Sequence, residues 1–281
     1  IGGAPLCSIE RGRSNNQEAE NIMGNSFFML VCSGIILTIL GLLIKKPLLY
    51  FLGASDDTYL YANKYISTYL LGNVFVMISL GMNHFINSQG FGRIGMMTVV
   101  FGAVSNIILD PIFIFVLDMG VQGAALATII SQFMSAMWVL QFLTGKKAIL
   151  RLKRNCFKLK KERVFRIIGL GTSGFVMQFT NSVVQFLCNS TLQQFGGDLY
   201  VGIMTVINSV REVIALPISG LGSGAQPVIG FNYGARQYKR VKDCIKFNTI
   251  ISVSYNIFVW LLIQILPEFF IRIFNNEQDV L

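Results

Sequence analysis

Three ionisable side chains lie deep inside long apolar stretches of the sequence. They are Asp110 in SNIILDPIFIF, and Arg211 and Glu212 in VGIMTVINSVREVIALP. Such intramembrane charges are costly and mark an ion or substrate pathway by default. A buried carboxyl group can hold a proton or face a cation, and competition between the two is the exchange chemistry of an antiporter.

Polar neighbours extend the pattern around Asp110. Asn106 lies four residues earlier on the same helix face. Pro111 removes one backbone donor and bends the helix, which frees a carbonyl for water or a cation. The next apolar stretch carries polar residues at helical spacing: Thr128, Ser131, Gln132 and Ser135. We expect the two helices to face each other across a wet pocket; the alternative is an Asp that caps a proline-bent helix.

A second polar stripe runs along a later apolar stretch. Its members, three or four residues apart, are Gln178, Asn181, Gln185 and Asn189. Amides hydrogen-bond varied ligands without a fixed charge, so the stripe suits a polyspecific cavity, although amides also join helices. Arg211 and Glu212, a turn past Asn208, point about 100° apart. They could bind cationic substrates or form a structural ion pair between helices.

The composition predicts the elements that carry these groups. The chain is 53% hydrophobic and 13% charged, about half the charged share of a soluble domain. Seven apolar stretches are long enough to cross a membrane as helices: 26–51, 60–87, 95–117, 122–143, 166–191, 200–228 and 247–272. Residues 1–8 resemble the end of a further span. The sequence thus predicts an all-α polytopic membrane protein.

Loop charge predicts the orientation of these helices. Most of the 23 basic residues fall in alternate loops, which favours the cytoplasmic side for those loops. Because the net charge of +9 is juxtamembrane, the expected partners are anionic lipid headgroups and not nucleic acid. No Gly-Lys-Ser/Thr phosphate loop is present. We therefore expect a transporter without ATP or another cofactor, and not an enzyme.

Two pairs of segments indicate an internal repeat. An offset of 222 residues places Gly2 on Gly224, Pro5 on Pro227 and Gly12 on Gly234. An offset of 220 places PLLYFLGASDD, from residue 47, on PEFFIRIFNNE, from residue 267. The proline stretches are predicted to be equivalent hinges at cytoplasmic helix ends, and Pro111 is predicted to be a further hinge.

The repeat predicts the domain organisation. Residues 1–143 form part of an N-lobe, 144–165 a basic cytoplasmic inter-lobe loop, and 166–281 part of a C-lobe. The chain would then be a fragment of a twelve-helix, two-lobe protein that lacks the N-terminal span and the last three spans. The lobes would be related by a pseudo-twofold axis with a substrate site between them. The alternative from another class is a seven-helix membrane sensor or receptor.

Three segments together resemble the multidrug and toxic compound extrusion family, especially its bacterial cation-drug exporters. They are GGAPLCSIERGRSNNQEAENIMGNSF, SQGFGRIGMMTVVFGAVSNIILDPIFIFVLDMGVQGAALATIISQ and GAQPVIGFNYGARQYKRVKDCIKF. The resemblance implies a secondary active antiporter that exports organic cations and amphipathic toxins by alternating access. The alternative within transport is a lipid-linked saccharide flippase of the same superfamily.

The same resemblance implies roles for individual residues. Asn106, Asp110 and Thr128 match polar positions that couple ions in the first half of some members. Gln178 stands near the position where the sodium-coupled branch carries a glutamate, so a proton is the preferred coupling ion and sodium the alternative. The cavity residues would bind small cationic drugs. We expect a monomer in the inner membrane of a bacterium, in contact with membrane lipids.

Overall fold

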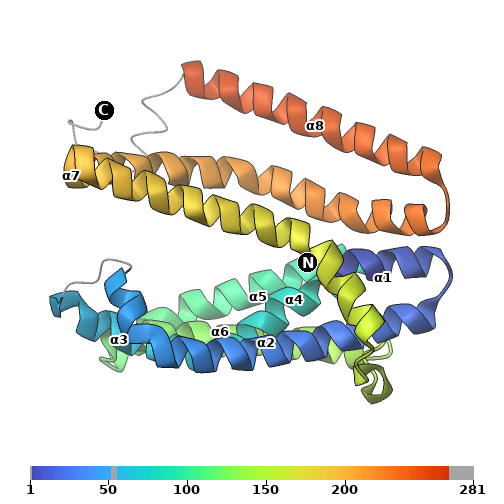
Figure 1. The fold of residues 1–281 in the computed structure, drawn as a ribbon, viewed down its shortest axis with the longest axis horizontal. Helices are drawn as coiled ribbons and strands as arrows, with labels where there is room; N and C mark the ends of the chain where they lie inside the picture. Colours follow the sequence, from blue (N-terminus) through green and yellow to red (C-terminus); the bar gives the residue numbers. More distant parts are fainter. Residues whose placement is uncertain (1, 52–55, 266–281) are drawn as a thin grey trace. The chain divides into compact units, whose positions relative to one another are not determined.

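The structure, a computed structural model, describes residues 2–51 and 56–265, and this part of the chain is almost entirely helical (Figure 1). Its α-helices are α1 (Gly3–Gly12), α2 (Asn16–Phe51), α3 (Asp56–Leu71), α4 (Asn73–Ser88), α5 (Gly92–Pro111), α6 (Gly120–Thr144), α7 (Lys161–Gly234) and α8 (Tyr238–Ile265). A π-helical turn, η1 (Ile112–Val116), follows α5, and a 3-10 turn, η2 (Arg154–Phe157), precedes α7.

The described residues contain six helices long and apolar enough to cross a membrane, or up to seven if one bent pair counts as a span. The chain is therefore a multi-pass membrane protein. The bent pair is α3 and α4, which meet at an angle of 54°. The stretch 60–87, predicted as one continuous span, is a broken helix in the structure.

Glycine and side-chain hydrogen bonds explain the break between α3 and α4. Gly72 separates the two helices, and its N–H bonds to the carbonyl of Tyr69 in a tightened turn. The hydroxyl of Thr38 in α2 donates to the carbonyl of Leu70 at 2.9 Å. The amide of Asn73 donates to the carbonyl of Gly34 in α2 at 3.2 Å. Helix α2 thus supplies polar partners at a break that lies at membrane depth, as hydrocarbon requires.

The chain divides into two compact units, Ile1–Leu170 and Gly171–Leu281. In the first unit, α4 and α5 both pack against α6, and α2 packs against α4. Aromatic pairs join these helices: the rings of Phe75 and Phe133 lie 5.0 Å apart, and those of Phe101 and Trp138 lie 5.3 Å apart. The predicted inter-lobe loop and the first turns of α7 belong to this unit, whereas the assignment of lobes remains a prediction.

The second unit consists of most of α7 together with α8. The two arms of α7 run side by side (Figure 1) and meet at Gly197, whose φ of 65° suits glycine. This turn lies between the predicted spans 166–191 and 200–228. The hydroxyl of Tyr255 in α8 donates to the carbonyl of Ile214 in α7 at 3.2 Å.

The predicted repeat reappears in the backbone of two turns. The turn after α1 has Ser14 at φ 61°, and the turn after α7 has Arg236 at φ 59°, 222 residues later. Four hydrogen bonds of the first turn recur in the second at the same offset. In one of them the N–H of Asn15 donates to the carbonyl of Glu10, and in its equivalent the N–H of Gln237 donates to the carbonyl of Asn232, both at 2.9 Å. The two turns therefore share one helix-ending geometry.

Of the predicted proline hinges, Pro227 lies inside α7, whereas Pro5 lies in the first turn of α1, two residues after its first residue, Gly3. Pro227 is seven residues before the last residue of α7, and Pro5 is seven residues before the last residue of α1. Their role as hinges remains a prediction. The second landmark of the repeat, from residue 267, lies outside the described residues, and so do residues 52–55 of its counterpart.

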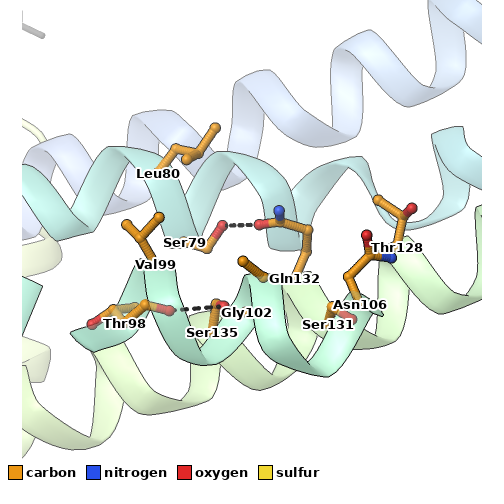
Figure 2. A pocket seen from close by; sticks show the side chains of 11 residues that line it. Ser79, Leu80, Thr98, Val99, Gly102, Asn106, Thr128, Ser131, Gln132 and Ser135 are labelled. Atoms are coloured by element: carbon orange, nitrogen blue, oxygen red, sulfur yellow. Dashed lines mark hydrogen bonds between the residues drawn. The ribbon is translucent and has the colours of Figure 1, made fainter. Parts of the chain in front are cut away.

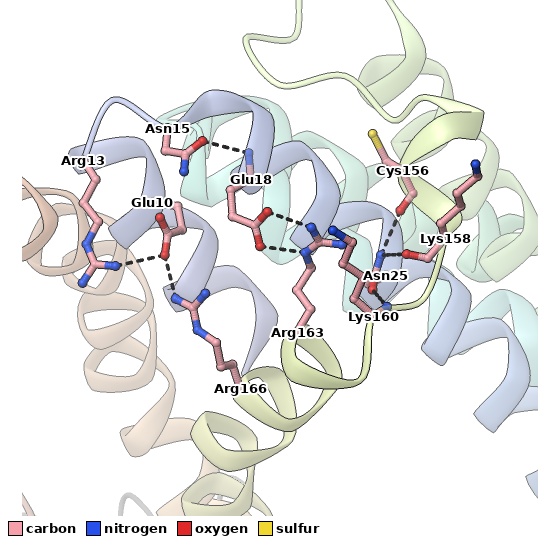
Figure 3. A network of polar contacts seen from close by, with 10 residues as sticks. All are labelled: Glu10, Arg13, Asn15, Glu18, Asn25, Cys156, Lys158, Lys160, Arg163 and Arg166. Carbon is pink, nitrogen blue, oxygen red and sulfur yellow. Dashed lines mark hydrogen bonds and ion pairs between the residues drawn. The ribbon is translucent and has the colours of Figure 1, made fainter.

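A segment between α6 and α7, residues 145–160, is bound along the first unit; we call it the strap. Asn25 of α2, which is fully buried, holds it through three backbone groups (Figure 3). Its amide donates to the carbonyls of Cys156 and Lys158 at 2.9 and 3.0 Å, and its oxygen accepts from the N–H of Lys160 at 3.2 Å. Burial raises the pKa of the Cys156 thiol. The loop predicted as a domain boundary is thus a packed element.

Ion pairs fasten the start of α7 beside the strap. Arg163 makes a bidentate pair with Glu18 at 2.6 and 2.8 Å, and Arg166 pairs with Glu10 at 2.6 Å (Figure 3). The Arg163 side chain is buried, so the forked geometry compensates a cation removed from water. These contacts explain why the first turns of α7 belong to the first unit.

Candidate functional site

The first unit contains a cavity of about 180 Å³ among α4, α5 and α6. We call it the first-unit cavity, and Figure 2 shows side chains from these helices converging on it. Its lining residues are Ser79, Leu80, Thr98, Val99, Gly102, Ala103, Asn106, Thr128, Ser131, Gln132 and Ser135. Asn106 of α5 therefore meets the polar face expected on α6 across one pocket.

The polar groups that line this cavity are partly hydrogen-bonded within the protein. The hydroxyl of Ser79 donates to the side-chain oxygen of Gln132, and that of Ser135 donates to the carbonyl of Thr98 at 3.4 Å (Figure 2). The hydroxyl of Ser131 is buried and has no partner among the described residues. A buried polar group without a partner is expensive, so the cavity is suited to water or a small polar ligand.

Gly102 is required by the close approach of α5 to α6. A Cβ at this position would lie 2.3 Å from the Ser135 hydroxyl. We expect Gly102→Ala to lower the free energy of unfolding by about 1–2 kcal/mol through overpacking. The second substitution Ser135→Ala should restore most of that loss, because it removes the colliding oxygen. The thermal unfolding midpoint in detergent measures both; failure of Ser135→Ala to restore it would place the strain elsewhere.

Asp110 lies one turn beyond the cavity lining and is half-buried. The side-chain amide of Asn106 donates to its carboxylate at 3.2 Å, which links the acid to the cavity. Pro111 ends α5 here and the π-helical turn η1 follows at once. Because proline cannot donate to the carbonyl four residues earlier, the α-helical pattern gives way to the π-helical turn here, whereas the bend at Pro111 stays a prediction. Thr128 lines the cavity, but its hydroxyl donates to the carbonyl of Ala124 in its own helix.

The second unit contains a larger cavity of about 960 Å³ between the two arms of α7, here the second-unit cavity. Its lining residues are Gln178, Asn181, Ser182, Gln185, Phe186, Asn189, Thr205, Asn208, Ser209, Arg211, Glu212 and Ser219. The amide stripe of the first arm thus faces the deep charges of the second arm. All seven residues that the sequence proposed for a substrate cavity line this one space, although their role in binding remains a prediction.

The polar side chains of the second-unit cavity are paired only in part among the described residues. The amide of Gln185 donates to Asn189 at 3.3 Å. Both polar atoms of the Asn208 side chain are buried and without partners among the described residues. The ion pairs of the described residues include none between Arg211 and Glu212. One acid, one base and several amides are therefore available to a ligand.

Sequence reasoning missed two polar members of the first-unit cavity, Ser79 and Thr98. Each is a single hydroxyl in an otherwise apolar stretch, and each also bonds to a carbonyl of its own helix. A lone Ser or Thr in a membrane helix carries no directional signal. The predicted hinges Pro5 and Pro227 line neither cavity.

Comparisons with known proteins agree with this arrangement of helices. The multidrug export protein MepA of Staphylococcus aureus is 26% identical over 284 residues, which covers all of this chain and 62% of that protein. A MOP superfamily transporter from Pyrococcus furiosus superposes with a TM-score of 0.92 at 23% identity, over 99% of this chain and 62% of that one. A crystal structure of MATE in the bent conformation superposes with a TM-score of 0.91 at 24% identity, over 97% of this chain and 61% of that one.

The chain thus spans about 62% of the length of the curated relative, and the two solved structures share its fold. The MatE family model matches residues 1–112 and 174–281. The match removes the alternative of an unrelated seven-helix sensor. Because the matched residues make up most of its length, this chain belongs to the MatE family.

Proposed function

We propose that the protein is a secondary active multidrug exporter, which releases organic cations and amphipathic toxins from a bacterial cell in exchange for protons or sodium. The observation that carries the proposal is the second-unit cavity, where neutral amides surround one acid and one base between membrane helices. The printed name of the Staphylococcus aureus relative, a multidrug export protein, supports the same activity. The protein would act as a monomer in the inner membrane.

The lining of the second-unit cavity suits cationic drugs. Glu212 supplies a negative charge, while Gln178, Asn181 and Gln185 offer donors and acceptors without a fixed charge. A carboxylate in a region of low dielectric attracts an organic cation more strongly than it would in water. The adaptable amides of one helix face can then serve ligands of different shape, which is the requirement for a polyspecific site.

Ion coupling is proposed at Asp110, with Asn106 and Thr128 beside it. The Asn106 amide donates to the Asp110 carboxylate at 3.2 Å, and a carboxyl group can either hold a proton or face a cation. A proton or sodium ion can therefore exchange at Asp110 as water enters and leaves the first-unit cavity. The bend at Pro111 and the turn η1 would convert this exchange into a movement of the helix end.

We propose a twelve-helix parent with two lobes related by a pseudo-twofold axis. The match of one family model to two separate stretches supports this arrangement. The equal turns around Ser14 and Arg236 support it independently. Alternating access would then expose the site first to one side of the membrane and then to the other.

Ethidium efflux from vesicles tests the proposal. The full-length protein is reconstituted, and a proton gradient or a sodium gradient is imposed separately. Efflux driven by one gradient would establish export and identify the coupling ion. If neither gradient drives efflux from folded, inserted protein, the proposal is wrong and the flipping of lipid-linked saccharides becomes the activity to assay.

Substrate ranking should depend on the amide stripe. Gln178→Leu removes one donor and one acceptor from the second-unit cavity while keeping the volume similar. We expect the order of minimum inhibitory concentrations among ethidium, a quinolone and a quaternary ammonium compound to change by several-fold. Gln141→Leu, at an exposed amide of α6 outside both cavities, is the matched control. An unchanged order for Gln178→Leu would mean that the stripe only joins helices.

A further inference from the structure

The strap has one apolar face and one cationic face. Its residues Ala148, Leu150, Leu152 and Cys156 are buried against the first unit. Residues 149, 151 and 153 alternate with these and point outward, because an extended chain places successive side chains on opposite faces. Six exposed cations lie on the outward face: Lys146, Lys147, Arg151, Arg154, Lys158 and Lys160.

The acids of α1 and α2 are already engaged with other cations. Glu10 pairs with Arg13 and Arg166, and Glu18 pairs with Arg163. Glu20 pairs with Lys153 at 2.7 Å. None of the ion pairs formed by the described residues uses the six outward cations. The outward face of the strap therefore carries a concentrated positive charge that no ion pair of the described residues neutralises.

The contacts of the strap with α2 fix its height relative to the membrane. Asn25, which holds the strap backbone, directly precedes Ser26 and the apolar run of α2. The ring of Phe157 stacks on that of Phe27 in this run, with ring centres 5.4 Å apart. Gly24 allows the close approach, since a Cβ there would lie 2.5 Å from the carbonyl oxygen of Cys156. Residues 156–160 are thus held where α2 enters the hydrocarbon.

An exposed leucine lies between the last two cations of the strap. Leu159 is 48% exposed, and the exposed side chains of Lys158 and Lys160 flank it. At the level of the headgroups, a leucine can enter the acyl boundary while lysines extend their charges to the phosphates. A soluble phosphate would bind to the lysines but has no acyl chain that could contact the leucine.

We propose that the outward face of the strap, centred on Lys158, Leu159 and Lys160, is a binding surface for anionic phospholipid headgroups. The three contacts of Asn25 pre-organise it, so binding does not have to order a flexible loop. Each lysine near an anionic membrane surface strengthens binding by about fivefold. The surface is separate from both cavities and does not depend on the transport activity.

Lipid binding to the full-length protein in detergent tests this proposal. Phosphatidylglycerol or phosphatidylcholine with the same acyl chains is titrated, and the bound lipid is measured by native mass spectrometry and by the shift of the thermal unfolding midpoint. The test variant is Lys158→Gln/Lys160→Gln, which leaves the contacts between Asn25 and the strap intact because Asn25 binds only backbone groups there. The matched control is Lys239→Gln/Lys242→Gln, with the same charge change at exposed positions of α8.

We expect the unmodified protein to prefer phosphatidylglycerol. The strap variant should have this preference reduced by about 25-fold, whereas the α8 variant should keep it within about twofold. Equal affinity of the unmodified protein for both lipids would overturn the proposal. So would an equal loss in both variants, because the effect would then be one of net charge. An equal rise of the thermal unfolding midpoint with soluble glycerol phosphate at the same concentrations would also contradict the proposal, because the lysines would then bind a free phosphate.

Discussion

Asp110→Asn in the full-length protein is expected to reduce ion-driven efflux to background while leaving membrane insertion intact. Asparagine keeps the size of the side chain and its contact with Asn106, but it can neither bind a proton nor carry a negative charge at neutral pH. The exchange of an ion for a cationic substrate then loses its chemical basis. Because Asp110 is only half-buried and forms no ion pair among the described residues, stability should change little.

Ethidium efflux under an imposed gradient, at equal amounts of inserted protein, measures this effect. Asp118→Asn is the matched control, because Asp118 is exposed in the turn between α5 and α6, where its φ of 52° suits asparagine equally. The control should retain efflux. Full drug resistance of cells that carry Asp110→Asn would show that Asp110 does not couple ions and serves only the bent helix end.

Asn25→Ala is expected to produce the largest loss of stability. The substitution removes three hydrogen bonds to the strap backbone and leaves two carbonyls and one N–H without those partners. At about 1 kcal/mol for each bond, the free energy of unfolding should fall by about 3 kcal/mol. The strap should also become accessible to protease, because its closest attachment to α2 is lost.

Thermal unfolding in detergent and limited proteolysis between residues 145 and 160 measure the two effects. Asn73→Ala is the control, since it removes one side-chain hydrogen bond to a backbone carbonyl, that of Gly34, and should have about a third of the effect on stability. A strap that stays protected in Asn25→Ala would show that the buried leucines hold it without the amide. Equal losses in the two variants would lead to the same conclusion.

Local patterns in the sequence were sufficient for much of the membrane architecture. Apolar stretches predict helices in lipid because each backbone group must bond within its own segment, and the described residues contain six helices long and apolar enough to cross a membrane, or up to seven if the bent pair counts as one span. The repeat at an offset of 222 residues predicted two turns that share their backbone geometry at Ser14 and Arg236. The spacing of Gln178, Asn181, Gln185 and Asn189 placed them on one face, because helical periodicity relates only near neighbours.

Contacts between distant segments were decided only by the tertiary structure. The break at Gly72 depends on Thr38 and Gly34 of another helix, and the strap that looked like a linker is docked because Asn25, 131 residues earlier, binds Cys156. The membership of Ser79 in the first-unit cavity likewise depends on Gln132 across the helix interface. The sequence alone determined which faces are apolar or polar, since that follows from periodicity. Which polar groups meet depends on packing between helices, and a single sequence carries no local signal for that.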